Sequence, residues 1–153
     1  MRARELMSYP VISCHVNDTL ATAARLMWDH DCGAIAVVKD EGVLTSMITD
    51  RDICMAAYTQ GRPLDEILVH SAMAHAAISA SPDVGVDEVE RLMAEHQIRR
   101  IPIVDPDNRP IGMITLADLA TECVRPATHL KQGRLAHTLA SIERRRQPKS
   151  QAA

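Results

Sequence analysis

Aromatic side chains are nearly missing from this sequence of 153 residues. Phe, Tyr and Trp together make up 2% of the chain, and there is no Phe. Hydrophobic residues still make up 46%, which is typical of a globular protein and not of a disordered one. The core must therefore be built from Ile, Val, Leu, Met and Ala. A planar ligand would have to bind between aliphatic side chains, because stacking rings are almost absent.

Long hydrophobic runs and paired cysteines are also missing. The longest uncharged apolar stretch, residues 32–38, is far shorter than the ~20 residues of a membrane-spanning helix. No apolar segment follows the basic N-terminus, so we expect no secretory signal and a cytoplasmic location. The four cysteines (Cys14, Cys32, Cys54 and Cys123) show no CxxC spacing, which favours free thiols in a reducing compartment.

Charge is spread unevenly along the chain. The net charge is −3, but residues 126–153 carry about +5 and the remainder about −8. The three arginines at 144–146 suit the C-terminal end of a helix. No aromatic residues are interleaved with them, so a surface for stacking nucleic-acid bases is not expected.

The chain repeats itself at a spacing of 66 residues. The stretch MITDRDI at residues 47–53 recurs as MITLADL at residues 113–119. Residues 7–53 align without a gap on residues 73–119, and 13 of the 47 pairs are identical, where roughly three would be expected from average residue usage. Two copies indicate an internal pseudo-dimer and not a solenoid, which needs at least ~3 stacked units.

Each copy predicts the same order of elements. A short extended piece (residues 11–13 and 77–79) is followed by a helix that begins at a capping residue, Asn17 or Ser81-Pro82. The apolar positions of these helices recur at helical spacing: Leu20, Ala23 and Met27, then Val86, Val89 and Met93. Two apolar runs then predict paired strands, at residues 34–38 and 43–48 and at 101–104 and 111–114. A second helix is expected directly after Thr49 and directly after Thr115.

Residues after 126 predict a separate amphipathic helix. Leu135, Leu139 and Ile142 would lie on one side of it. We expect residues 147–153 to be disordered.

Two short motifs carry a family resemblance. IPIVD at residues 101–105 and GMITLAD at residues 112–118, in this order of elements, resemble a CBS domain, named for cystathionine β-synthase. Two such domains in tandem are called a Bateman module. The first copy departs from the pattern, with Ala36 in place of the Pro and Ser46 in place of the Gly. The resemblance covers residues 6–125. Within the family, the sequence is especially similar to small stand-alone proteins with two CBS domains.

The resemblance implies a mixed α/β (α+β) fold of two strand–helix–strand–strand–helix motifs. Motif 1 would span residues 6–63 and motif 2 residues 64–125, paired about a pseudo-twofold axis. Residues 126–153 would form the C-terminal amphipathic helix and a basic tail. Two chains would associate through their helices into a homodimer. No catalytic domain or catalytic motif is expected, so a separate effector protein would have to read any signal.

The repeated Thr-x-x-Asp sequence has two interpretations. Thr49 with Asp52, and Thr115 with Asp118, form the pattern of a capping box at a helix start, which is purely structural. The same geometry can also serve a nucleotide, because a helix N-terminus attracts phosphate and a carboxylate accepts hydrogen bonds from ribose hydroxyls. Arg51 would add a cation in the first copy.

The resemblance favours the second interpretation and implies an adenosine-binding cleft in each copy. CBS-domain proteins that this sequence resembles hold ribose with the Asp and phosphate with the neighbouring Thr or Ser, and the adenine lies in an apolar slot. AMP, ADP or ATP would be the ligand, with S-adenosylmethionine or NAD as alternatives, and no metal is expected. The implied site residues are Ile12, Ser13, Ala34, Ile35, Thr49, Arg51 and Asp52 in the first copy, and Ile78, Ser79, Arg100, Ile101, Pro102, Thr115 and Asp118 in the second.

Other functions are left open by the residues alone. The module could be a ligand-free interaction protein in which the Thr-x-x-Asp pairs only cap helices. Cys14, His15 and Cys32 could form a redox or metal sensor, although their spacing is irregular. Arg99 and Arg100 could be a solvated pair or an anion contact that faces the cleft between the copies. His30 and His96 occupy equivalent positions near helix ends, where a structural role is expected.

Overall fold

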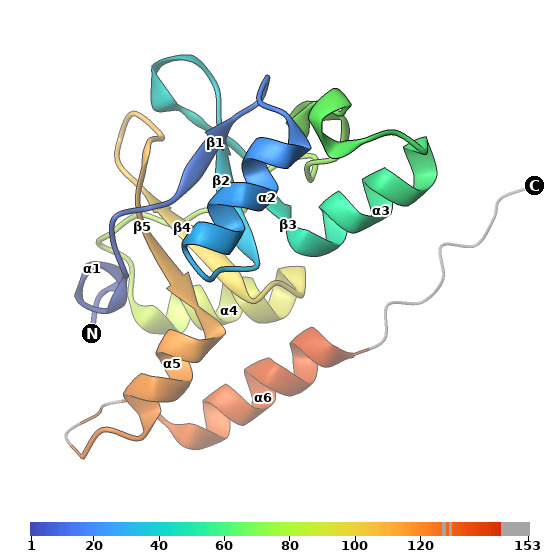
Figure 1. Cartoon of the computed structure of the whole chain (residues 1–153). Helices are drawn as coiled ribbons and strands as arrows, with labels where there is room; N and C mark the ends of the chain where they lie inside the picture. The colour runs from blue at the N-terminus through green and yellow to red at the C-terminus, as the bar shows by residue number, and fades with distance from the viewer. Residues whose placement is uncertain (127, 129, 145–153) are drawn as a thin grey trace, which may run out of the picture.

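The computed structural model describes residues 1–126, 128 and 130–144, and two similar units account for most of them (Figure 1). Unit 1 contains β1 (Ser13–His15), α2 (Leu20–Asp29), β2 (Ala34–Val38), β3 (Leu44–Thr49) and α3 (Asp50–Gln60). Unit 2 contains α4 (Val86–His96), β4 (Arg100–Val104), β5 (Pro110–Thr115) and α5 (Leu116–Cys123). A short N-terminal helix α1 (Ala3–Leu6), a C-terminal helix α6 (Gln132–Glu143) and three 3₁₀ turns complete the chain: η1 (Asp40–Gly42), η2 (Leu64–Glu66) and η3 (Val69–Ser71). The prediction of a mixed α+β fold with two tandem motifs is confirmed.

The first strand of each copy lies later in the sequence than predicted. In unit 1 it is Ser13–His15, which pairs in parallel with β2. In unit 2 only an isolated bridge between Ala80 and Ile103 marks it. The Ala80 amide donates to the Pro102 carbonyl at 3.1 Å, but Pro82 has no N–H with which to continue the ladder.

The predicted helix starts at Asn17 and Ser81-Pro82 are wrong by several residues. Helix α2 begins after Thr19, whose hydroxyl accepts from the Thr22 amide at 3.2 Å, and α4 begins after Gly85. The Asp18 carboxylate accepts from the His15 amide at 2.7 Å, so residues 15–18 form a turn instead. The Pro82 carbonyl accepts from the Arg4 amide at 3.0 Å, a long-range contact that no local pattern reveals.

The paired strands and the second helices follow the prediction. Strands β2 and β3 are antiparallel, as are β4 and β5. Their registers place Ala34 opposite Thr49 and Arg100 opposite Thr115. Each hairpin therefore brings the start of one strand beside the Thr that begins the following helix. Gly61 closes α3 in the left-handed conformation, with φ of 61°, which glycine adopts without strain.

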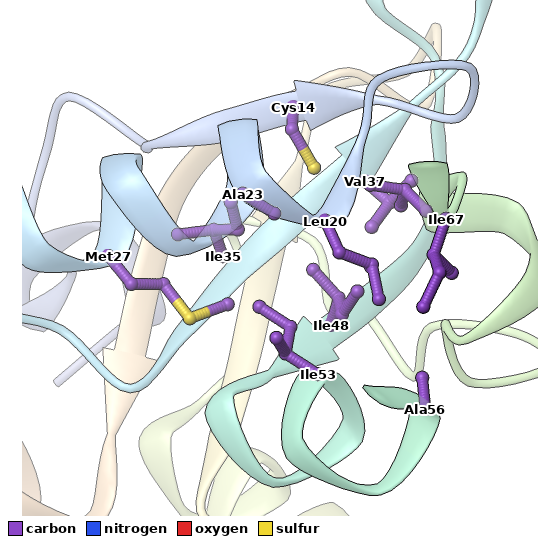
Figure 2. Packing of buried hydrophobic residues seen from close by; sticks show 11 residues of the cluster. Cys14, Leu20, Ala23, Met27, Ile35, Val37, Ile48, Ile53, Ala56 and Ile67 are labelled. Carbon is purple, nitrogen blue, oxygen red and sulfur yellow. The ribbon is translucent and has the colours of Figure 1, made fainter. Parts of the chain in front are cut away.

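Each unit has its own aliphatic core. In unit 1 the predicted stripe of Leu20, Ala23 and Met27 packs against Ile35 and Ile48, all buried (Figure 2). The equivalent stripe of α4, namely Val86, Val89 and Met93, is at most 1% exposed. It packs against Ile101, Ile103, Ile114 and Leu119. Apart from Cys14 in unit 1, Ile, Val, Leu, Met and Ala form both cores, as the near-absence of aromatic residues predicts.

The two units exchange their leading segments. Ser8, ahead of unit 1, pairs with Met113 of β5 through amide–carbonyl bonds of 2.9 and 3.0 Å. Ala74, at the equivalent position ahead of unit 2, donates to the Met47 carbonyl of β3 at 3.2 Å. Each leading segment thus lies on the strand of the other unit, as a pseudo-twofold arrangement requires.

Helix α6 lies along α4 and α5 (Figure 1). Leu135 and Ile142 pack against the unit 2 core, whereas Leu139 is 45% exposed. The predicted amphipathic helix is therefore present, and Arg144 follows its last residue. The predicted disorder of residues 147–153, and two of the three arginines, lie outside the described residues. Among the helices described, none is long and apolar enough to cross a membrane.

Candidate functional site

Both Thr-x-x-Asp sequences form complete capping boxes. The Thr49 amide and hydroxyl donate to Asp52 Oδ2 at 2.9 and 2.7 Å, and the Asp52 amide donates to Thr49 Oγ1 at 3.1 Å. The corresponding distances for Thr115 and Asp118 are 2.7, 2.7 and 3.2 Å. These bonds use one carboxylate oxygen of each Asp. The capping role therefore leaves Oδ1 of both residues available to a ligand hydroxyl.

Arg100 reaches from unit 2 toward unit 1. A Cβ atom built on Gly33 would lie 3.6 Å from Arg100 Nη2 and 3.0 Å from Asp50 Oδ2. Gly33 precedes β2, and Asp50 is the first residue of α3, so the Arg100 guanidinium lies close to the N-terminus of the helix in the other unit. A cation between two helix starts can neutralise an anionic ligand in the cleft.

The residues expected to line the adenine slots divide into two groups. Ile12, Ser13, Ile78 and Ser79 lie in the first extended segment of each copy, Ala34 lies opposite Thr49, and Ser13 is exposed. Ile35 and Ile101 are 1% and 0% exposed and belong to the two cores. Their side chains therefore pack away from solvent, and only their backbone groups are available at a slot. Pro102 is buried as well, and Arg51 is exposed on the first turn of α3.

A cavity of about 390 Å³ lies between α2 and α3 of unit 1, with Gly33 and Asp50 in its wall. A larger cavity of about 560 Å³ opens at the start of α5, and Arg99, Arg100, Thr115, Leu135, Leu139 and Glu143 are among the residues that line it. The expected Arg100 and Thr115 are thus brought together. The same wall contains three residues of α6, whose presence there no local sequence pattern predicts.

Arg99 and Arg100 point to different places. Arg99 forms an ion pair with Glu143, the last residue of α6, whereas Arg100 approaches Gly33 and Asp50. The sequence leaves open whether the two form a solvated pair or an anion contact; both line the larger cavity, and Arg100 also approaches unit 1. The partner of Arg99 lies 44 residues away in sequence, too far for any local pattern to predict.

The predicted alternative of a redox or metal sensor depends on Cys14, which is a poor candidate for a reactive thiol. Cys14 is 3% exposed, and burial together with the Asp18 carboxylate raises the pKa of its thiol to about 11. Such a thiol stays protonated near neutral pH and is a poor nucleophile or metal ligand. In the part of the chain that the structure describes, no three His, Cys, Asp or Glu side chains are grouped to hold a metal ion. His30 and His96 are exposed at the ends of α2 and α4.

The chain is also similar to known proteins. The family model described as CBS domain matches residues 3–58 and 66–125. CBS domain-containing protein YhcV of Bacillus subtilis (strain 168) is 41% identical over 117 residues, which are 76% of this chain and 81% of the relative.

Two solved structures are similar over most of the chain. Hypoxic Response Protein I, solved with two coordinated zinc ions, gives a TM-score of 0.73 at 30% identity, over 86% of this chain and 100% of that one. The CBS domain pair of protein MJ0100, solved with 5-methylthioadenosine and S-adenosyl-L-methionine, gives 0.72 at 26% identity, over 79% and 94%.

Proposed function

This chain belongs to the CBS-domain family, and on that premise we propose that it is a regulatory module that binds adenosine-containing ligands in the cleft between its units. AMP, ADP and ATP are the preferred candidates, and S-adenosylmethionine and NAD share the adenosine that the site would recognise. The chemistry is binding and not catalysis. A ligand would act by favouring one arrangement of the units, or of a homodimer, which a separate effector protein then reads.

The observation that carries this proposal is the pairing of a capping box with a cation at the facing helix. Asp118 Oδ2 is used by Thr115, so Oδ1 would accept from a ribose hydroxyl. Arg100 is opposite Thr115 in the register and also approaches the start of α3. Ribose and phosphate would then be held by adjacent groups, as an adenine nucleotide requires.

A thermal-shift titration tests the proposal. We expect one of AMP, ADP, ATP, S-adenosylmethionine or NAD to raise the melting temperature, since a ligand at 100 times its Kd stabilises the folded state by ~2.7 kcal/mol. If ATP is that ligand, 2′-deoxy-ATP should give a smaller shift. Asp118→Ala or Asp52→Ala should abolish it.

The control is Thr19→Ala, which removes the N-cap of α2 away from the proposed ribose contacts. It should cost ~1 kcal/mol of stability, as cap deletions do, and leave the ligand-induced shift intact. If Asp118→Ala and Thr19→Ala both lower stability and no ligand shifts either protein or the wild type, the sensor proposal is wrong.

The second candidate is a ligand-free interaction module. The capping boxes favour it because Thr and Asp satisfy one another in each copy without any ligand. In that case Asp118→Ala should change stability only, by the ~1 kcal/mol of a lost cap, and binding of an effector protein should not depend on any nucleotide.

A further inference from the structure

Helix α6 contributes part of the wall of the larger cavity. Leu135, Leu139 and Glu143 line it together with Arg100 and Thr115. Glu143 is paired with Arg99, and their side chains are 51% and 59% exposed. A carboxylate of the chain itself therefore lines the same cavity as Arg100, the cation to which the proposed function assigns the phosphate.

The C-terminal turn of α6 is fastened to the segment that leads into β4. Gln97 Nε2 donates to the carbonyls of Ser141 and Arg144 at 3.1 and 3.0 Å. Gln97 has a positive φ of 53° where α4 ends. Arg99 follows two residues later, so a change in what Arg99 binds acts directly on the same turn of α6.

The N-terminal half of α6 is attached independently of the cavity. Arg134 pairs with Glu90 of α4 at 2.7 Å, and the Glu90 side chain is 3% exposed. Thr138 is buried on the same side. The two ends of α6 are thus held by separate contacts, and one end can loosen while the other stays docked.

We propose that a phosphate-bearing ligand and Glu143 compete for Arg99, so that ligand binding loosens the C-terminal turn of α6. This inference rests on the proposed function and adds to it the ligand class and the element that responds. A phosphate satisfies the Arg99 guanidinium in place of the carboxylate, and like charge repels Glu143 from the cavity. Because coupling between sites is reciprocal, loosening that turn by mutation must also tighten the ligand.

The ligand class follows from the charge in the cavity. Adenosine has no phosphate with which to displace Glu143, so its binding should leave α6 unchanged. ATP should loosen α6 because its phosphates extend from the ribose site toward the cations. The site would thus distinguish nucleotides from uncharged adenosine derivatives by their effect on α6.

The experiment compares ATP and adenosine on the wild type and on Glu143→Gln. Calorimetry should give ATP binding about two- to five-fold tighter to Glu143→Gln, the range expected from loss of an exposed ion-pair competitor. Hydrogen exchange at residues 139–143 should rise when ATP binds the wild type and should not rise with adenosine. The gain from Glu143→Gln should shrink at high salt, which screens exposed charges.

Glu95→Gln is the matched control. Glu95 is an exposed carboxylate paired with Arg91 on α4, so this variant makes the same change in net charge away from the cavity and should leave ATP affinity unchanged. If ATP binds but exchange in α6 is unaltered, or if adenosine raises it equally, this inference is wrong and the proposed function stands. If ATP binds neither the wild type nor Glu143→Gln, this inference is wrong, whereas the proposed function is wrong only if AMP, ADP, S-adenosylmethionine and NAD also fail to bind.

Discussion

Gly112 and Ser46 occupy the same repeat position, and the exchanged segments explain why the residues differ. A Cβ atom on Gly112 would lie 2.7 and 2.9 Å from Cγ and Cβ of Met7, so the absence of a side chain there lets Met7 approach. Ser46, which is buried, instead donates to the Ala74 carbonyl at 2.6 Å. At this repeat position, both copies therefore contact the leading segment of the other unit, one through a glycine and the other through a serine hydrogen bond.

Gly112→Ala should lower the free energy of unfolding by about 1–3 kcal/mol, as overpacking of a close contact does. Urea unfolding measures it. Gly133→Ala is the control, because nothing lies within 4 Å of the added Cβ in α6, and alanine favours a helix by up to ~1 kcal/mol over glycine. Equal stability of Gly112→Ala and the wild type would contradict the close approach of Met7.

Glu90 predicts a pH dependence of stability. Burial raises the pKa of its carboxyl above the ordinary value of 4.5, against the opposing effect of Arg134. Folding therefore favours the protonated form, and the free energy of unfolding should fall as pH rises from 4.5 through the raised pKa and then level off. The other charged or titratable side chains that line the same pocket as Glu90, besides Arg134, are Asp87, Arg91 and His137.

Glu90→Gln should flatten this decline, which denaturant titrations between pH 4 and 8 can measure. Glu88→Gln is the comparison, because the Glu88 side chain is 41% exposed and the hydrogen bond from Arg91 lowers its carboxyl pKa. Its removal should leave the decline in place. If the free energy of unfolding still declines with pH in Glu90→Gln, the decline is due to another titratable group.

At the scale of elements, residues in contact with their sequence neighbours were predictable and those with distant partners were not. The strands around Ile35 and Ile101, and the helices after Thr49 and Thr115, follow from apolar runs and a capping box that are local. The start of α4 was misplaced because Pro82 is engaged by Arg4. In the site, a local motif predicts Thr115 and Asp118. Glu143 reaches the site only because α6 docks against unit 2, and no sequence spacing predicts that docking.

Docking of α6 should depend on Leu135 more than on Leu139. Leu135 packs against the unit 2 core, and Leu139 is 45% exposed. Leu135→Ala should cost roughly 1–2 kcal/mol, below the 2–5 kcal/mol of a fully buried leucine, and should raise hydrogen exchange throughout residues 132–143. Leu139→Ala should have a smaller effect on both. The reverse order would mean that α6 docks through its other side.

At the scale of the whole molecule, α6 makes the two units unequal. Ala94 of α4 lines a pocket together with α6, and its repeat equivalent in unit 1 is Trp28, which is 87% exposed. Tyr58 and Met55 of α3 are 82% and 47% exposed on the same unit. The helices of unit 2 are thus covered by the chain itself, while those of unit 1 present large apolar side chains to solvent.

The proposed homodimer should therefore form through the unit 1 helices. Trp28→Ser should weaken self-association at least ten-fold, since a buried Trp at an interface commonly contributes 2 kcal/mol or more, as sedimentation equilibrium would measure. Trp28 is the sole tryptophan, so its fluorescence should shift to the blue as the wild-type concentration rises. Tyr9→Ser is the control, because Tyr9 is an aromatic residue that is 76% exposed outside these helices. If the wild-type chain stays monomeric, or if Trp28→Ser does not weaken the dimer, the unit 1 helices are not the dimer interface. They would then be available to the effector protein.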